Sequence, residues 1–225
     1  MTSNNRPDNS YRRFQWLFLI LDPRWVEVIA QIWNLGKKIF RGFSNEGIYE
    51  ALDYEYQIEL QDKDGEHATI KKREKVRYLQ DNITSFQDWA WGDKKIFLNY
   101  RCSPGTPVDE FRLGHKTCKL ISLRETRNKG DIDEFHMEWE MKRGFSKTTG
   151  FWGTGIRYRT KKVTVKVIFP TDRPPIHASI TESNLKRTQI LGPEAQKLLL
   201  DGRTMVVWEN SNPRLYETYV LKWEW

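Results

Sequence analysis

The sequence is poor in cysteine and has no apolar run long enough to cross a membrane. Its 225 residues include 2 cysteines, Cys102 and Cys118, and no CxxC pair, which argues against a disulfide scaffold and a cysteine-rich zinc site. The apolar stretch 14–21 is short, because a membrane span takes about 20 apolar residues. No small-residue cleavage site follows it, as a signal peptide would require. We therefore expect reduced thiols and a cytoplasmic protein, either free or attached peripherally to a membrane.

The motifs of catalysis and cofactor binding are also missing. The glycine-rich stretch 150–155, GFWGTG, lacks the Gly-Lys-Ser/Thr ending of a phosphate-binding loop. Glu134, His136 and Glu138 share one face of a predicted strand, but a zinc site usually has more nitrogen or sulfur ligands that converge. We interpret that face as solvated and ion-paired. The sequence thus predicts no cofactor and no metal, and a non-enzymatic role rather than catalysis.

Aromatic residues, by contrast, are abundant. The chain has 10 Trp, 9 Tyr and 11 Phe, a load typical of strand-rich cores and of binding surfaces. The formal net charge of +7 permits anionic partners without identifying one.

The clearest helix pattern runs over residues 22–43. Asp22 is a good N-cap, Pro23 suits the first helical position, and the following residues divide into an apolar face and a basic face. The apolar face can pack on a sheet of the same chain. It can instead bind a membrane surface or a protein partner, as amphipathic helices with tryptophan and a basic polar face do. The residues that we expect to make this contact are Trp25, Ile29, Ile32, Trp33, Ile39 and Phe40.

From Ala51 onwards the apolar residues recur at every second position, which predicts strands. We expect a flexible N-terminus at residues 1–10, an amphipathic helical segment at 11–47 and a β domain at 48–225. The expected fold is all-β, with about ten mostly antiparallel strands in a sandwich or partly closed barrel, preceded by the amphipathic helix. A small helix is also predicted over 193–200, because Pro193 suits its first position.

The first two predicted strands carry opposite charges on one face. A three-residue loop at 64–66 would pair Glu59 with Lys71 and Glu55 with Lys75, and each directly opposed pair contributes about 0.2–1 kcal/mol. The alternative is a free basic stripe that binds an anion, formed by Lys71, Arg73, Lys75 and Arg77.

A second basic set lies in the segment 151–169. The apolar alternation before Thr160 is out of phase with the alternation after Lys161, so we predict a β-bulge or a bend at these two residues. The basic residues placed outward by this phase are Arg157, Arg159, Lys162 and Lys166. They could pair with the acidic face of the predicted strand 132–141, or they could bind an anion.

These patterns favour a non-enzymatic interaction module, recruited to an anionic membrane surface or a protein partner through the amphipathic segment. The alternative is a nucleic-acid-binding protein that uses the basic strand faces. Salt separates the two hypotheses, because binding to nucleic acid weakens steeply as the salt concentration rises, whereas apolar insertion does not.

Overall fold

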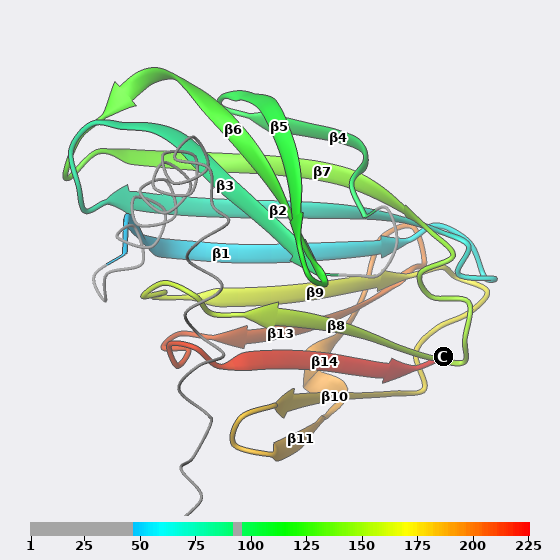
Figure 1. Cartoon of the computed structure of the whole chain (residues 1–225). Coiled ribbons are helices and arrows are strands. Elements are labelled where there is room, and N and C mark those ends of the chain that lie inside the picture. The colour runs from blue at the N-terminus through cyan, green and yellow to red at the C-terminus, as the bar shows by residue number, and fades with distance from the viewer. Residues whose placement is uncertain (1–46, 92–95) are drawn as a thin grey trace, which may run out of the picture. The chain divides into compact units, whose positions relative to one another are not determined.

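The computed structural model describes residues 47–91 and 96–225 (Figure 1). This part of the chain is nearly all β and forms three sheets, none of which closes into a barrel. The all-β prediction is therefore confirmed for the described residues, with fourteen strands in place of the ten expected. The strands are β1 (Tyr49–Leu60), β2 (His67–Tyr78), β3 (Ile83–Trp91), β4 (Leu98–Ser103), β5 (Thr106–Leu113), β6 (Lys116–Arg127), β7 (Ile132–Lys142), β8 (Thr149–Gly155), β9 (Val163–Phe169), β10 (His177–Glu182), β11 (Arg187–Leu191), β12 (Gln196–Leu198), β13 (Thr204–Asn210) and β14 (Thr218–Glu224).

The largest sheet has seven strands in the order β12-β13-β9-β1-β2-β7-β4. β1 lies at its centre, antiparallel to β2 and parallel to β9, and the parallel pairing runs from Tyr54 opposite Val163 to Glu59 opposite Ile168. The other neighbouring strands of this sheet are antiparallel. The sheet is thus mostly antiparallel, as predicted, with one parallel pair at its centre.

Alternating side chains on β1, β2 and β7 divide the large sheet into a charged face and an apolar face. On the apolar face Ile58 of β1 is paired with Ile70 of β2 and with Val167 of β9, and all three side chains are buried. Side chains on successive positions of a strand point to opposite faces, so Glu59 lies on the charged side. An apolar face of this size must be covered.

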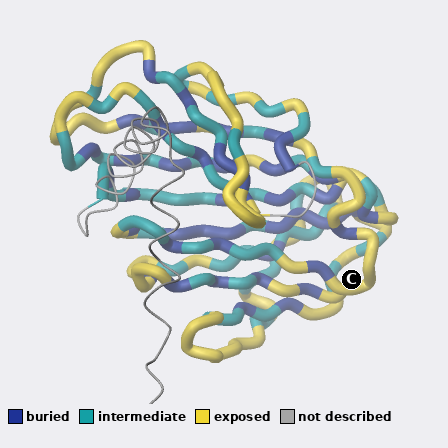
Figure 2. The backbone as a smooth tube through the Cα atoms, viewed as in Figure 1, coloured by how far each residue is buried: buried dark blue, intermediate teal, exposed yellow. Residues whose placement is uncertain are grey.

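The two smaller sheets cover the apolar face of the large one (Figure 1). They are a four-stranded sheet, β11-β10-β14-β8, and a three-stranded sheet, β3-β6-β5. Phe86 of β3 stacks on Phe135 of β7 with ring centroids 3.9 Å apart, and Trp152 of β8 lies 5.2 Å from Tyr56 of β1. Figure 2 shows the buried positions alternating along these strands. The architecture is a sandwich whose second layer is divided in two.

The hairpin of β1 and β2 forms as predicted, but its register differs by two residues. Glu55 lies opposite Arg73, not Lys75. The cause is a longer loop, residues 61–66, in which the Asp62 carboxylate accepts hydrogen bonds from the backbone amides of Asp64, Glu66 and His67 at 2.9–3.0 Å. From Asp53 to Leu60, a shift of two residues leaves each side chain on its predicted face. Before Asp53 a β-bulge changes the phase, so Ala51 is buried in place of the predicted Leu52.

The small helix predicted over 193–200 is wrong. Pro193–Ala195 forms a single 3-10 turn, and the next residues form β12, which pairs with β13. A helix of this length is marginal on its own, and the hydrogen bonds offered by a neighbouring strand outweigh its weak propensity.

The phase change predicted at Thr160 and Lys161 is present as a break between strands of two different sheets. β8 ends at Gly155 in the four-stranded sheet, and β9 begins at Val163 in the seven-stranded sheet. Between them Thr160 makes a single parallel bridge to Ala51. The apolar phase changes here because the two strands belong to different sheets.

The predicted amphipathic helix lies outside the described residues, and so do Trp25, Ile29, Ile32, Trp33, Ile39 and Phe40. Within residues 47–91 and 96–225, we find no helix with the length and apolar character needed to cross a membrane.

Candidate functional site

A cavity of about 400 Å³ lies between the edges of the two small sheets. β3 is the outer strand of the three-stranded sheet and β8 is the outer strand of the four-stranded sheet; both line the cavity, and β1 and β2 of the large sheet form its floor. Binding cavities for small molecules commonly have volumes of about 300–1,000 Å³. The divided second layer therefore leaves a space of suitable size above the large sheet.

Three buried charged residues meet at the floor of the cavity. Lys72 Nζ lies 2.7 Å from Asp88 Oδ1 and 3.0 Å from Glu74 Oε2. Lys72 and Glu74 are each 5% exposed and Asp88 is fully buried. The alternation of β2 puts Lys72 and Glu74 in the same phase as buried Ile70 and Val76, and this phase turns both charges toward the interior.

In this cluster, burial and neighbouring charges shift the pKa values of Lys72 and Glu74 in opposite directions. Desolvation lowers the pKa of Lys72, but Asp88 and Glu74 outweigh it, so the pKa lies well above the ordinary value. Desolvation raises the pKa of Glu74 in spite of the neighbouring ammonium group. The cluster thus favours a protonated Lys72 and favours protonation of Glu74 relative to an exposed carboxyl.

Tyrosines surround the buried cluster. The Tyr100 hydroxyl donates a hydrogen bond to Asp88 Oδ2 at 2.9 Å, and Lys72 Nζ lies 5.0 Å from the ring centroid of Tyr54 and 5.6 Å from that of Tyr56. Desolvation by burial raises the pKa of Tyr56 and, together with Asp88, that of Tyr100. These hydroxyls consequently remain protonated and able to donate.

Arg157 lies at the aromatic side of the cavity. Its guanidinium carbon is 4.7 Å from the ring centroid of Trp89 and 5.5 Å from that of Trp91, which are distances of cation–π contact. Lys116 lies over the same Trp91 ring at 5.6 Å, and desolvation, with the charge of Arg157, lowers the pKa of Lys116. Trp91 is 38% exposed and Phe151 is 67% exposed, so the cavity opens to solvent on this side.

Three polar side chains that line the cavity contain a buried atom with no hydrogen-bond partner among the described residues. The atoms are Trp152 Nε1, Thr154 Oγ1 and Arg157 Nη2. Buried polar atoms without partners are rare in folded proteins. The Trp and Arg nitrogens can only donate. All three atoms are buried, so an acceptor oxygen of a ligand would contact them only after the side chains move.

The remaining charges of the lining are basic. Apart from the buried cluster, the charged lining residues are Arg143, Lys147 and Arg157, and Arg143 forms an ion pair with Glu66 at 3.1 Å. In the described part of the chain, no group of three or more His, Cys, Asp or Glu side chains could hold a metal ion. The arrangement is suited to an anion with an apolar body.

The two cysteines are free, and neither is an activated nucleophile. Desolvation by burial, with a contribution from Asp88, raises the pKa of Cys102 to about 11 and that of Cys118 to about 12. The thiolate is the reactive form of cysteine, and at neutral pH both thiols are protonated.

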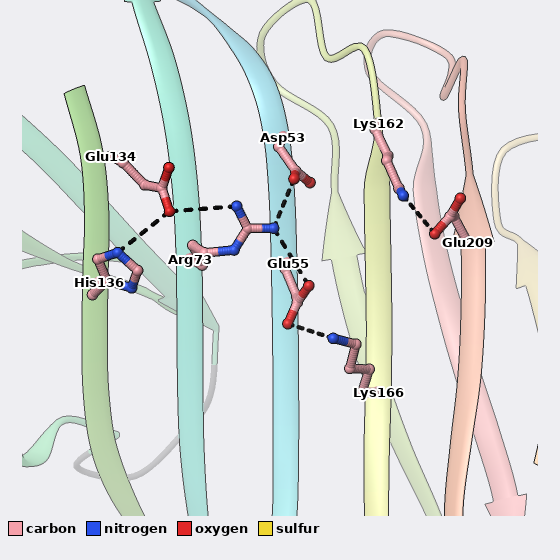
Figure 3. Close-up of polar contacts among 8 residues, drawn as sticks. All are labelled: Asp53, Glu55, Arg73, Glu134, His136, Lys162, Lys166 and Glu209. Atoms are coloured by element: carbon pink, nitrogen blue, oxygen red, sulfur yellow. Dashed lines mark hydrogen bonds and ion pairs between the residues drawn. The ribbon is translucent and has the colours of Figure 1, made fainter. Parts of the chain in front are cut away.

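Most of the basic residues predicted as an anion-binding stripe lie on the outer face of the large sheet and form ion pairs. Figure 3 shows the centre of this network, where Arg73 lies 2.7 Å from Asp53 and 3.5 Å from both Glu55 and Glu134. The same figure shows the contacts of Lys166 with Glu55 and of Lys162 with Glu209, both at 2.7 Å. Acidic partners were expected for both basic sets. For Lys162 and Lys166, however, they lie on β13 and β1 and not on the predicted strand 132–141, because β9 is next to β13 and β1 in the sheet.

The other predicted basic residues have three different environments. Lys71 lies 3.6 Å from Glu59, and Arg77 lies 3.0 Å from Glu50. No ion pair within residues 47–91 and 96–225 involves Lys75 or Arg159. Arg157 lines the cavity, so the structure does not bring the eight residues together into one stripe.

Sequence reasoning missed the buried cluster, although part of its signal was visible. Lys72 and Glu74 stand out because they share the phase of Ile70 and Val76 in an otherwise apolar series. The sequence around Asp88 contained no such signal. Its partner Lys72 is sixteen positions away and lies in a different sheet, and a local pattern cannot predict such a contact.

Comparisons with known proteins add no family. No protein-family model matches the sequence, and no curated protein matches it. Among solved structures, the chain is similar to one described as a "putative protease" from Parabacteroides distasonis ATCC 8503, with 10% identity and a TM-score of 0.47. The match covers 79% of this chain and 40% of that chain. A similarity of this degree supports no functional argument.

Proposed function

We propose that the β domain is a non-enzymatic binding module that takes a small anionic ligand with a flat, apolar body into the cavity between β3 and β8. The observation that supports this proposal most directly is the place of Arg157, whose guanidinium group lines the cavity over the rings of Trp89 and Trp91. A ligand anion beside this guanidinium would gain a hydrogen bond to a charged donor.

The walls favour the apolar part of such a ligand. Trp89, Trp91 and Tyr54 line the cavity, and aromatic side chains hold flat groups by stacking or edge-to-face contact. Arg157 already lies over two tryptophan rings, so its charge is held in place before a ligand arrives. A preorganised charge lowers the cost of binding.

The test uses two fluorescent probes that differ in charge. Anilinonaphthalene sulfonate is anionic and aromatic, whereas phenylnaphthylamine has the same ring system without the sulfonate. We expect the sulfonate to bind to the full chain and Arg157→Gln to weaken its binding by roughly 10- to 100-fold, because a hydrogen bond to a charged group contributes about 1.5–3 kcal/mol. Binding of the uncharged probe should change little.

Arg159→Gln is the matched control. Arg159 is exposed, lies two positions from Arg157, and is not part of the cavity lining. An equal loss of sulfonate binding in both variants would point to general surface charge and would contradict a ligand site in the cavity. The same would follow if Arg157→Gln left binding of the sulfonate unchanged.

A second proposal concerns the amphipathic segment and rests on its sequence pattern. Its apolar residues would recruit the protein to an anionic membrane or a partner. In that case Ile32→Glu with Ile39→Glu abolishes flotation with anionic liposomes, or partner binding, and leaves the melting temperature of the β domain nearly unchanged. If the face is instead packed in a core, the same pair of substitutions unfolds the protein, because two carboxylates would be buried without partners.

The alternative of nucleic-acid binding has less support. On the outer face of the large sheet, Lys71, Arg73 and Lys166 have carboxylates within 4 Å, and a phosphate would have to compete with them. A steep loss of binding to DNA or RNA with rising salt would favour this alternative over the cavity.

A further inference from the structure

We propose that Lys72 and Asp88 condense to form an intramolecular amide bond that crosslinks β2 to β3, with Glu74 carrying the proton. The bond would join the large sheet to the three-stranded sheet that covers it. This inference does not depend on the proposed ligand, because the crosslink forms within the chain and is detected without any probe.

The geometry places the reacting groups in contact. Lys72 Nζ is 2.7 Å from Asp88 Oδ1, so the nitrogen already lies beside the carboxyl group that it would attack. Asp88 is fully buried and Lys72 is 5% exposed, which keeps both side chains in one arrangement. Two groups held in this way react with effective concentrations that reach roughly 10⁵–10⁸ M in well-oriented cases.

Burial also favours the reaction in the forward direction. An ammonium and a carboxylate in an apolar interior keep a large desolvation penalty, even when they are paired. Condensation converts both into one neutral amide and releases one water molecule. Ile70 of β2 lies two positions before Lys72, and Phe86 of β3 lies two positions before Asp88. Both point to the same side of their strands as the reacting residues and both are buried, so their surroundings suit a neutral amide.

The bond changes balance without a further reactant. Lys72 first passes a proton through Glu74 to Asp88 Oδ1, and its neutral amine then attacks Asp88 Cγ to form the C–N bond. Because Asp88 and Glu74 raise the pKa of Lys72, this proton transfer is the uphill step. The C–Oδ1 bond then breaks, and Oδ1 leaves as water after receiving two protons that the amine has lost. The starting ammonium and carboxylate therefore yield an amide and water, and Glu74 ends in the state in which it began.

The neighbours fit the roles that this step needs. Glu74 Oε2 is 3.0 Å from Lys72 Nζ, close enough to take a proton from the amine. Lys72 Nζ also lies 2.7 Å from Asp88 Oδ1, the leaving oxygen that finally receives this proton. The Tyr100 hydroxyl donates to Asp88 Oδ2 at 2.9 Å. We therefore assign Oδ2 as the oxygen that stays in the amide. The Tyr100 hydroxyl would stabilise the negative charge on Oδ2 when Cγ becomes tetrahedral.

The test is the mass of the purified full chain under denaturing and reducing conditions. We expect the mass to be lower than the sequence mass by one water molecule. After trypsin digestion, the fragment with Lys72 should be joined covalently to the fragment 78–94, which contains Asp88, and Lys72 itself should resist cleavage. Loss of water at an Asp-Gly step such as Asp64-Gly65 would give the same intact mass without the joined fragment.

Variants distinguish the mechanism from accidental dehydration. Asp88→Asn can form the same amide by releasing ammonia, so its mature mass should equal that of the unaltered protein. Glu74→Gln retains the shape of the side chain but cannot carry the proton, and most of that protein should stay uncrosslinked. Glu134→Gln, on the opposite face of the large sheet, should crosslink fully.

Two results would overturn the inference. One is an unaltered protein with the full sequence mass and no joined fragment, which needs no variant to interpret. The other is a joined fragment that forms equally in Glu74→Gln, which would remove Glu74 from the chemistry even if the bond itself were present.

Discussion

Gly155 of β8 lies directly against the indole ring of Trp91 of β3, and a Cβ atom added at Gly155 would overlap that ring. This contact brings together the edges of the two small sheets beside the cavity. It also exists only because position 155 has no side chain. Trp91 is 38% exposed, so its ring can move outward if the space is filled.

Gly155→Ala should therefore weaken binding of anilinonaphthalene sulfonate with little loss of stability. The displaced ring takes away an aromatic contact of about 0.5–1.5 kcal/mol, which corresponds to roughly a 2- to 10-fold rise in Kd. Fluorescence titration measures this change. Gly153→Ala is the control on the same strand, because a Cβ atom at Gly153 would meet nothing within 4 Å. Equal effects of the two substitutions would contradict the role given to Trp91.

Gly150→Ala should act on stability instead. A Cβ atom at Gly150 would overlap the ring of Trp223, which is 3% exposed and lies 5.5 Å from Phe145 and 5.9 Å from Phe169 between ring centroids. This ring has no path to solvent, and overfilling a packed core costs about 1–3 kcal/mol. Denaturant unfolding would measure the loss. A variant as stable as Gly153→Ala would show that the core around Trp223 is more adaptable than its packing indicates.

Acid should remove the contribution of Asp62 to stability. Desolvation raises the pKa of this carboxyl, but backbone amides of Glu66, His67 and Asp64 outweigh it and the net pKa is lowered. The folded-state pKa therefore lies below the unfolded value, so the stabilisation is complete above the unfolded pKa of about 3.9. It is lost as the pH falls through the lower folded pKa.

Comparison with Asp62→Ala measures this effect. We expect the variant to be about 1–2 kcal/mol less stable at neutral pH, because it loses hydrogen bonds to a charged acceptor, and the difference to shrink below about pH 4. A difference that stays constant down to pH 2 would mean that ionisation of Asp62 is not what organises the loop.

The register of the β1–β2 hairpin can be tested by double-mutant cycles. Arg73 lies 2.7 Å from Asp53, whereas Arg77 pairs with Glu50. Removing Asp53 and Arg73 together should reveal a coupling of about 0.2–1 kcal/mol, and the pair Asp53 and Arg77 should show none. Coupling of Asp53 to Arg77 would instead restore the register expected from a three-residue loop.

Much of the sheet structure could be predicted from alternation alone. The strands near Ala51, His67 and Ile132 were placed by their period of two, and the charged and apolar faces of β1 were assigned correctly from Asp53 onward. The register of the β1–β2 hairpin was predicted wrongly. It depends on how the Asp62 carboxylate organises the loop, and the alternation of the strands does not determine how many residues the loop contains.

The cavity could not be derived in the same way. It depends on β3 and β8 lying at the edges of two separate sheets, which is a property of the complete topology. Arg157 was assigned to an outward stripe, whereas it lines the cavity, and its role in anion binding stays a prediction. The amphipathic segment remains a prediction from sequence.

The parallel pairing of β1 with β9 has a consequence for how this domain is made. Tyr54 finds its partner Val163 more than one hundred positions later, so the central strand of the large sheet is synthesised long before its second neighbour. Such distant pairing slows folding, because the cost of closing the intervening chain comes before the gain from contacts. Until β9 emerges, one edge of β1 stays open, and unpaired strand edges invite association with other chains. A ribosome-bound intermediate that ends before residue 163 should therefore depend on chaperones more than the finished domain does.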